Sequence, residues 1–329
     1  MKILYLPNYY SQQRQREKKA VIYPVHMAME ATYYRNKGHE VVFSIGMSNS
    51  NHSLNYYYDR IVTEPEGLPF DILPSPDRFL TKSLHPIYQN NGNFKYKPGT
   101  YILSASTCWY RKCAFCVERK KQDFYTRPVR SVLQEITHCQ AIGFREIFDD
   151  SGTFPVGKWL EEFCQWRSGK KYPKISCNMR LGTGVDYKMM KDAGFRMLLY
   201  GIESANQNTL DRLQKGTKAD EIVSEIKRAS EAGLEPHIAV MFGYPWETVK
   251  EEYRTLRLVH YLLRKGYAKT AQASIYSPDG ISFRDRAKPE PKEIYRAAYH
   301  PSFWINRLLD IRGWEDFTYL YRGIREALK

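Results

Sequence analysis

Nine residues, Cys108-Trp109-Tyr110-Arg111-Lys112-Cys113-Ala114-Phe115-Cys116, contain three of the six cysteines of this 329-residue chain. The stretch follows a short apolar run at residues 100–103, which reads as a β-strand. Three thiolates on one loop can ligate three irons of a [4Fe–4S] cube and leave the fourth iron open to an outside ligand. The spacing therefore predicts an iron–sulfur site just after a strand.

Other readings of these cysteines fit less well. A structural zinc site needs a fourth protein ligand, and the nearest candidates, His138 and Cys139, fall in an expected helix well beyond the loop. A thioredoxin-like pair of Cys113 and Cys116 leaves Cys108 without a role. The remaining cysteines are most simply core residues: Cys139, Cys164 and Cys177.

On the C-terminal side of the loop, short apolar runs alternate with helical segments, which is the pattern of parallel β/α units. We therefore expect an α/β fold built on a partial (β/α)6 TIM-like barrel. The expected helices lie near residues 130–141, 158–166, 187–193, 219–232 and 248–265, and the expected strands at residues 100–103, 146–148, 174–177, 197–200, 237–241 and 273–276.

Polar or metal-binding residues follow every expected strand. In a parallel α/β barrel, reactive groups gather at the carboxyl ends of the strands. The cysteine loop follows the first strand, and the later strands lead into Asp149 and Asp150, Asn178 and Arg180, Glu203 and Ser204, the stretch from Gly243 to Glu247, and Ser277.

The first hundred residues do not continue this pattern. Residues 2–6, 25–36 and 40–45 read as strand, helix and strand, which make one βαβ unit, and residues 65–98 carry six prolines. We therefore divide the chain into a truncated Rossmann-like βαβ unit at 1–64, a Pro-rich linker wrapped on the next domain at 65–98, the barrel at 99–285, and a helical C-terminal extension at 286–329.

The C-terminal extension is rich in aromatic residues. Phe317, Leu320, Ile324 and Leu328 are spaced for one face of a helix. Because acidic residues are mixed among the basic ones, we expect this face to pack against the barrel rather than to lie on a membrane surface.

Composition narrows the class of protein. With 43% hydrophobic and 26% charged residues and no apolar run long enough to span a bilayer, the chain is neither disordered nor an integral membrane protein. No signal-peptide pattern precedes the first expected strand, and the cysteine usage suits a reducing compartment, so we expect a cytoplasmic protein.

The net charge is +14, which favours an anionic partner. The densest basic patch lies beside the cysteines, and a second basic group lies at residues 14–19. Such a patch can draw in an anionic substrate or an acidic electron donor, or can form a solvated face. Its bases are Arg111, Lys112, Arg119, Lys120, Lys121, Arg127 and Arg130, against the acids Glu118 and Asp123.

Together these motifs resemble the radical S-adenosylmethionine (radical SAM) superfamily, and within it the branch whose members often carry an N-terminal cobalamin-binding domain. The likeness covers roughly residues 65–329. It rests on the cysteine loop with Phe115 before its last cysteine, on Phe148-Asp149-Asp150, on Gly201-Ile202-Glu203-Ser204-Ala205-Asn206, on Met241-Phe242-Gly243-Tyr244-Pro245-Trp246-Glu247-Thr248, and on Pro278-Asp279-Gly280.

The resemblance implies that Cys108, Cys113 and Cys116 bind a [4Fe–4S] cluster whose open iron chelates the methionine part of S-adenosylmethionine. Reductive cleavage of that cofactor then yields a 5′-deoxyadenosyl radical. The implied cofactor contacts are Asp149 or Asp150 at the ammonium, Arg180 at the carboxylate, Glu203 or Ser204 at the ribose, and the backbone near Phe115, Val240 and Gly243 at the adenine, with Asn178 and Tyr276 as further cofactor-binding residues.

Three of these polar residues also have structural alternatives. Asp150 can cap the following helix, Arg180 can pair with Asp186, and Glu203 can form a structural ion pair.

The sequence departs from the superfamily's pattern in two ways. The spacing C-x4-C-x2-C is one residue longer than the commonest C-x3-C-x2-C. None of the eight histidines lies in the Asp-x-His-x-x-Gly pattern by which many relatives ligate cobalamin, so we expect no cobalamin.

We therefore predict that the chain is a radical SAM enzyme. It is expected to act on an unidentified anionic substrate and to receive electrons from a donor such as flavodoxin or ferredoxin. No catalytic residue is assigned beyond the cofactor contacts. One alternative is a cobalamin-dependent radical SAM methyltransferase. The other is a non-enzymatic, zinc-stabilised nucleic-acid-binding protein, which the +14 charge and the 26 tyrosines motivate.

Overall fold

The computed structural model describes residues 1–7, 23–44, 58–89, 94–116, 123–170, 173–277 and 289–327. The chain divides into two compact units, the first comprising Met1–Ser106 with Tyr125–Asp150 and the second comprising Thr107–Phe124 with Ser151–Lys329. The Pro278-Asp279-Gly280 motif, the basic group at 14–19 and the basic residues at 119–121 lie outside the described residues.

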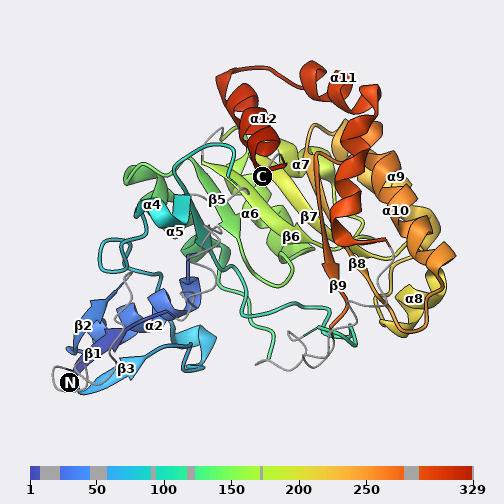
Figure 1. Cartoon of the computed structure of the whole chain (residues 1–329). Coiled ribbons are helices and arrows are strands. Elements are labelled where there is room, and N and C mark those ends of the chain that lie inside the picture. The colour runs from blue at the N-terminus through green and yellow to red at the C-terminus, as the bar shows by residue number, and fades with distance from the viewer. Residues whose placement is uncertain are drawn as a thin grey trace. The chain divides into compact units, whose positions relative to one another are not determined.

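A small parallel sheet opens the first unit (Figure 1). Strands β1 (Lys2–Tyr5) and β2 (Glu40–Phe43) and helix α2 (Val25–Asn36) form the predicted βαβ unit. A third strand, β3 (Arg60–Val62), pairs with the other edge of β1 and was not predicted. Three residues are too short a run to show a two-residue alternation, so only the pairing with β1 identifies this strand.

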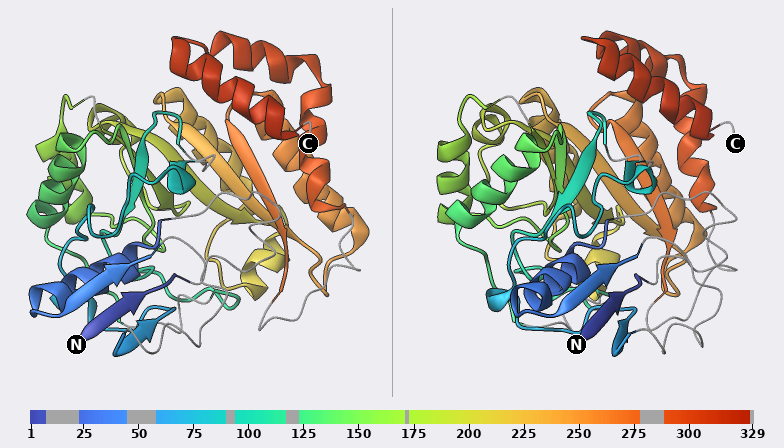
Figure 2. Two further views of the ribbon diagram at one scale, coloured as in Figure 1. Left: turned by 60° about the vertical axis from the view of Figure 1, so that its left-hand side comes forward. Right: turned by 90° about the vertical axis from the view of Figure 1, so that its left-hand side faces the viewer.

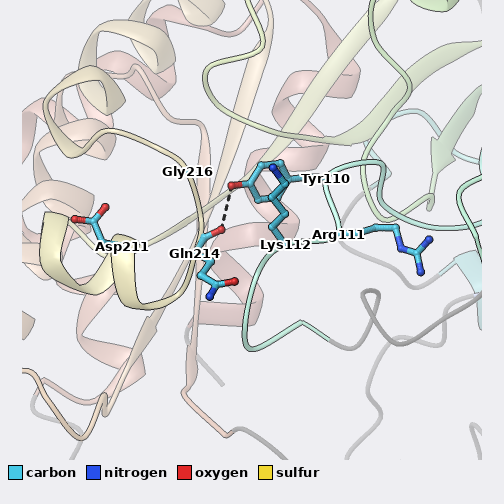
Figure 3. A pocket seen from close by; sticks show the side chains of 6 residues that line it. All are labelled: Tyr110, Arg111, Lys112, Asp211, Gln214 and Gly216. Atoms are coloured by element: carbon cyan, nitrogen blue, oxygen red, sulfur yellow. Dashed lines mark hydrogen bonds between the residues drawn. The ribbon is translucent and has the colours of Figure 1, made fainter.

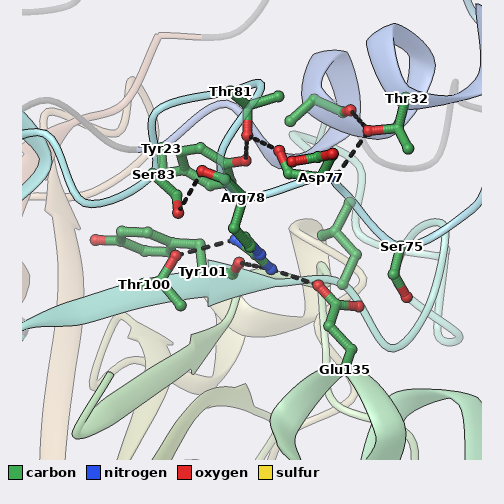
Figure 4. Close-up of polar contacts among 12 residues, drawn as sticks. Tyr23, Thr32, Ser75, Asp77, Arg78, Thr81, Ser83, Thr100, Tyr101 and Glu135 are labelled. Atoms are coloured by element: carbon green, nitrogen blue, oxygen red, sulfur yellow. Dashed lines mark hydrogen bonds and ion pairs between the residues drawn. The ribbon is translucent and has the colours of Figure 1, made fainter. Parts of the chain in front are cut away.

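The proline-rich segment of the first unit contains η2 (Phe70–Ile72) and α4 (Pro86–Gln89). Arg78 from this segment is 2% exposed and donates to Thr100 Oγ1 at 3.0 Å and to the Tyr101 carbonyl at 3.1 Å (Figure 4). It also pairs with Glu135 of α5 (Val129–Ala141), which accepts a second hydrogen bond from Arg127. A buried, doubly paired carboxylate thus fixes the segment to its neighbours.

The large sheet has the strand order β4-β5-β6-β7-β8-β9. All six predicted runs form strands, and the pairs β4–β5, β6–β7, β7–β8 and β8–β9 are parallel. The expected α/β fold with a partial (β/α)6 barrel is therefore confirmed. The strands are β4 (Gly99–Ile102), β5 (Glu146–Asp149), β6 (Lys174–Met179), β7 (Phe195–Glu203), β8 (Glu235–Phe242) and β9 (Thr270–Ile275).

The connecting helices follow the predicted segments to within one residue at each end, and one helix was missed. The missed element, α8 (Gln207–Arg212), is six residues long and follows β7 directly. The others are α5, α6 (Lys158–Arg167), α7 (Tyr187–Asp192), η4 (Ala219–Glu221) continuing into α9 (Ile222–Glu231), and α10 (Val249–Arg264).

Helix α10 shows why these segments are helical. Thr248 accepts a hydrogen bond from the Glu251 backbone, and the Glu251 carboxylate accepts one from the Thr248 backbone at 2.8 Å, which makes a capping box. The helix buries Leu256, Val259 and Leu263, spaced by three and four residues, along one face.

The C-terminal extension contains η7 (Pro291–Tyr299), α11 (Pro301–Leu309) and α12 (Trp314–Ala327), drawn in red in Figure 2. The face that was expected to be packed is only partly covered, because Phe317 is 49% exposed and Leu320 and Ile324 are half-buried. Among the described residues, no helix is long and apolar enough to cross a bilayer.

Candidate functional site

The cysteine loop belongs to the second unit and carries the three clustered cysteines. Cys113 is buried, and Cys108 and Cys116 are half-buried. The Cys108 thiol donates to Thr153 Oγ1 at 3.2 Å, the Cys116 amide donates to the Cys113 carbonyl at 3.2 Å, and the Ala114 amide donates to the Leu213 carbonyl at 2.9 Å. The loop is thus tied to segments that follow β5 and β7.

Tyr110 fills the long spacer between the first two cysteines and holds it against the turn at residues 213–216 (Figure 3). Its hydroxyl donates to the Gln214 carbonyl at 3.1 Å. The turn can approach so closely because residue 216 is glycine: a Cβ on Gly216 would lie 2.3 Å from the Tyr110 oxygen. Arg111, the next spacer residue, has a φ of 51°, a conformation that side chains other than glycine rarely adopt.

Two cationic side chains lie behind this spacer. The Arg180 guanidinium lies 3.4 Å from the centroid of the Tyr110 ring, donates to the Lys215 carbonyl, and is 8% exposed as a residue. The Lys215 ammonium donates to Glu203 Oε1 at 2.8 Å, and these two side chains are 12% and 10% exposed. A chain of contacts therefore runs from Tyr110 through Arg180 and Lys215 to Glu203.

Glu203 ends β7 in a strained backbone conformation. Its φ is 66°, and the pairing of β7 with β8 shifts register between Gly201 and Glu203. A Cβ on Gly201 would lie 2.4 Å from Glu203 Oε1 and 3.0 Å from the Lys215 ammonium. Glycine at position 201 therefore leaves room for the Glu203 carboxylate to contact Lys215. The structural ion pair that was considered for Glu203 from the sequence is present.

The electrostatics around Cys113 suit a ligated thiolate. Burial raises the pKa of the Cys113 thiol, while the nearby Lys215 and Arg180 cations act in the opposite direction. Lys215 is close to the loop by geometry as well, because its ammonium lies 5.9 Å from the centroid of the Phe115 ring. Ligation by iron removes the thiol proton, and buried cations stabilise the negative charge that remains.

Phe115 joins a largely aromatic cluster made from four segments of the chain. Phe115, Met241 and Trp246 pack against the buried Leu213, Tyr244 and Tyr276. The centroids of the Tyr244 and Tyr276 rings are 4.9 Å apart. The Tyr244 hydroxyl is buried and has no hydrogen-bond partner among the described residues. The fold therefore brings together two residues predicted to bind the cofactor, Phe115 and Tyr276, and Tyr244, which follows the predicted Gly243.

Val240 and Gly243 come from the end of β8. Val240 is 1% exposed and pairs in register with Glu203. Gly243 has a φ of 84°, and its amide donates to Glu252 Oε1 at 2.7 Å.

Ser204 lies in a polar network beside Glu203. Its hydroxyl donates to Glu247 Oε1 at 2.7 Å, and the same oxygen accepts from Asn206 Nδ2 at 2.9 Å and Thr209 Oγ1 at 2.6 Å. The other oxygen, Glu247 Oε2, is buried and without a hydrogen-bond partner in the described part of the chain. The network joins the loop after β7 to the loop after β8.

The remaining candidates lie on β5 and β6. Asp149 is fully buried and accepts from the Ser104 amide at 2.9 Å, whereas Asp150 is exposed. Both belong to the first unit, whereas Asn178 belongs to the second, where its side-chain amide donates to the Ser151 carbonyl at 2.9 Å. Asp150 does not cap a helix, because α6 begins after Gly157.

The alternative partner for Arg180 is also occupied elsewhere. Asp186 accepts from the Met189 amide at 3.0 Å and caps α7, while Arg180 donates to the Lys215 carbonyl. The prediction that the other three cysteines are core residues is confirmed, since Cys139, Cys164 and Cys177 are at most 1% exposed.

Sequence reasoning missed Tyr110, Lys215 and the acceptor role of Glu247. Two features of the sequence lie beside them: the extra spacer residue next to Tyr110, and a Lys215-Gly216 pair three residues after α8, a helix that was itself not predicted. Neither indicates which distant side chain each residue meets.

No group of three or more His, Cys, Asp or Glu side chains among the described residues converges on a single metal ion. A [4Fe–4S] cube held at three different irons does not require such convergence, because each thiolate binds its own iron. The donor set, three thiols on one anchored loop with buried cations beside it, suits that group.

Comparison with known families gives the same result. A model of the radical SAM superfamily matches residues 102–259, which span the cysteine loop and β5 to β8. This part of the chain belongs to the radical SAM superfamily. The match confirms the resemblance drawn from the sequence and the expectation of a radical SAM enzyme, and the family implies a [4Fe–4S] cluster and S-adenosylmethionine as cofactors.

Solved structures similar to this chain include three enzymes. The methyltransferase TsrM from Kitasatospora setae, with cobalamin and a [4Fe–4S] cluster bound, is 20% identical over 55% of this chain and 38% of its own, with a TM-score of 0.47. Methylornithine synthase (PylB) is 16% identical over 68% of each chain, with a TM-score of 0.47. The cobalamin-dependent S-adenosylmethionine radical enzyme OxsB is 12% identical over 92% of this chain and 47% of its own, with a TM-score of 0.49.

This chain therefore spans less than half the length of TsrM and of OxsB. A search of curated proteins found none with significant sequence similarity.

Proposed function

We propose that Cys108, Cys113 and Cys116 hold a [4Fe–4S] cluster and that the chain cleaves S-adenosylmethionine reductively to act on an anionic substrate. The observation that carries this proposal is the anchored loop with its three cysteines, packed beside the buried Lys215 and Arg180. The bound cluster and cofactor together supply a 5′-deoxyadenosyl radical. The chain's own part is to position the cofactor, to exclude water and to balance charge.

The contacts in the second unit support particular roles. The aromatic cluster around Phe115, Tyr244 and Tyr276 offers an apolar surface next to the cysteine loop, which suits an adenine ring. Glu203 lies at the end of β7 with one oxygen on Lys215, and it can accept hydrogen bonds from ribose hydroxyls. Ser204 already donates to Glu247, so we assign it to hold the Glu203 loop in place.

The remaining assignments rest on charge and place in the fold. Arg180 would contact the cofactor carboxylate, and Asp149 or Asp150 the ammonium group, because opposite charges at strand ends recognise a zwitterion. Asn178 would act as a further polar contact. A small acidic electron donor such as flavodoxin or ferredoxin would approach the basic side chains on the cysteine loop itself, Arg111 and Lys112.

Anaerobic reconstitution with iron and sulfide tests the cluster assignment. We expect the chain to bind about four irons, as one cube requires. Cys113→Ala should lose most of this iron, whereas Cys164→Ala, a change at a buried core cysteine, should retain it. Equal iron content in both variants would contradict the proposal. Binding of about one zinc with no iron would favour the zinc-stabilised nucleic-acid-binding alternative.

We further propose that cobalamin is not a cofactor of this chain. The support is that none of the eight histidines of this sequence lies in an Asp-x-His-x-x-Gly pattern. Protein purified from cobalamin-supplied cells should carry no corrinoid absorbance. A stoichiometric corrinoid would contradict this proposal and favour the cobalamin-dependent methyltransferase alternative, while leaving the cluster assignment intact.

A further inference from the structure

A cavity of about 610 Å³ lies between α10 and the start of α11 and contains none of the residues assigned above (both helices are labelled in Figure 1). Its lining has five basic residues and no acidic residue. The lining residues are Arg257, His260, Tyr261, Arg264, Lys265, His300, Ser302 and Asn306.

The basic residues of this cavity are concentrated on one face of α10. Arg257, His260 and Arg264 are spaced by three and four residues, which places them side by side along the helix. The helix dipole favours cations only in the last turn, whereas Arg257 lies about two turns before the end of α10.

These cations lack the acidic partners that nearby basic residues have. No carboxylate among the described residues forms an ion pair with Arg257, Arg264 or Lys265. In contrast, Lys269 pairs with Asp310 at 2.5 Å and Arg296 pairs with Glu293 at 2.8 Å. The Arg264 Nε atom is buried and, within the described ranges, has no hydrogen-bond partner. An anion in the cavity would offset this uncompensated charge.

The walls of the cavity are held in place by their own hydrogen bonds. Asn306 Nδ2 donates to the Arg264 carbonyl at 2.6 Å and to the Ser302 carbonyl at 2.9 Å, which joins α11 to the end of α10. His260 Nε2 donates to the Glu293 carbonyl at 2.9 Å. His300 Nδ1 accepts from the Ser302 amide at 3.2 Å, so its Nε2 carries the proton and remains a donor.

We propose that this cavity is a binding site for a small phosphorylated molecule. Arginine guanidinium groups and a lysine ammonium are the side chains that recognise phosphate oxygens, and His300 adds a further donor. The volume lies within the range of small-molecule sites. The lining holds a single tyrosine, Tyr261, whereas a nucleic-acid strand is bound along an extended basic groove with several stacking aromatic residues, so a small ligand is favoured.

Isothermal titration of the full, cluster-loaded chain with inorganic pyrophosphate tests this proposal. We expect saturable binding of one pyrophosphate per chain. The double variant Arg257→Gln/Lys265→Gln removes two exposed cations and should weaken binding by about tenfold or more. Lys250→Gln, an exposed lysine at the other end of α10, is the matched control and should bind like the unmodified chain.

Several results would overturn the proposal. One is an equal loss of affinity in Lys250→Gln, which would show a diffuse attraction to the +14 chain. Another is tighter binding of citrate than of pyrophosphate, which would indicate a carboxylate site. A third is binding of phosphatidylglycerol vesicles or of single-stranded RNA that pyrophosphate does not compete away. Iron content and circular dichroism of the variants should match the unmodified chain, so that this test is independent of the cluster assignment.

Discussion

The Arg180 guanidinium stacks on the Tyr110 ring, with 3.4 Å between the guanidinium carbon and the ring centroid. Tyr110 lies in the spacer that is one residue longer than usual, and Arg180 directly follows β6. The stacking places a barrel residue under the loop that carries the three cysteines. The contact between Arg180 and Tyr110 thus holds the longer spacer in place. Variants of the residues around Tyr110 can measure how much these contacts stabilise the fold.

Gly216→Ala should destabilise the second unit by about 1–3 kcal/mol, because residue 216 has a φ of 64° and the new Cβ would meet the Tyr110 oxygen. Tyr110→Phe alone should cost about 1 kcal/mol through loss of the hydrogen bond to Gln214. In the Tyr110→Phe background, Gly216→Ala should cost less than in the unmodified chain, as a double-mutant cycle by urea unfolding would show. Strictly additive effects would mean that the two residues do not meet.

Lys215→Met should leave Glu203 buried without its cation and destabilise the protein by about 3 kcal/mol. The exposed pair Lys218–Glu221 provides the control, and Lys218→Met should have a small effect. Lys215→Met/Glu203→Gln should recover much of the stability, because neither variant side chain is charged.

The same variants also test charge balance at the cluster. Loss of the Lys215 cation should make the midpoint potential of the reconstituted cluster more negative, because the reduced form carries one more negative charge. A redox titration followed by electron paramagnetic resonance measures this. An unchanged potential in Lys215→Met would limit Lys215 to a structural role.

His237 on β8 should make stability depend on pH. Burial lowers the pKa of His237 from 6.5 to about 4, and its Nδ1 lies 2.7 Å from Thr270 Oγ1. The unfolded chain binds this proton below about pH 6.5 while the folded chain does not, so stability is full above that pH and falls as the pH drops toward 4. The loss should total roughly 3 kcal/mol. His237→Gln keeps a polar side chain that does not titrate. In this variant, the free energy of unfolding should change less between pH 7 and pH 4 than in the unmodified chain.

The barrel was predictable because each of its strands is a compact apolar run followed by a helical period. Helix α8 was missed because its six residues, Gln207–Arg212, are too few to establish a period. The candidate site was predictable only in its residue types. Which partners they meet depends on contacts between distant segments, such as Arg180 with Tyr110, and a local pattern pointed instead to Asp186, which caps α7.

The most direct test of the central claim is formation of 5′-deoxyadenosine from S-adenosylmethionine by the reconstituted, reduced protein under anaerobic conditions, followed by liquid chromatography. We predict that the unmodified chain and Cys164→Ala form it and that Cys108→Ala, Cys113→Ala and Cys116→Ala do not. Formation of 5′-deoxyadenosine by any of these three variants at the unmodified rate, or its absence from the unmodified chain carrying about four irons, would contradict the account.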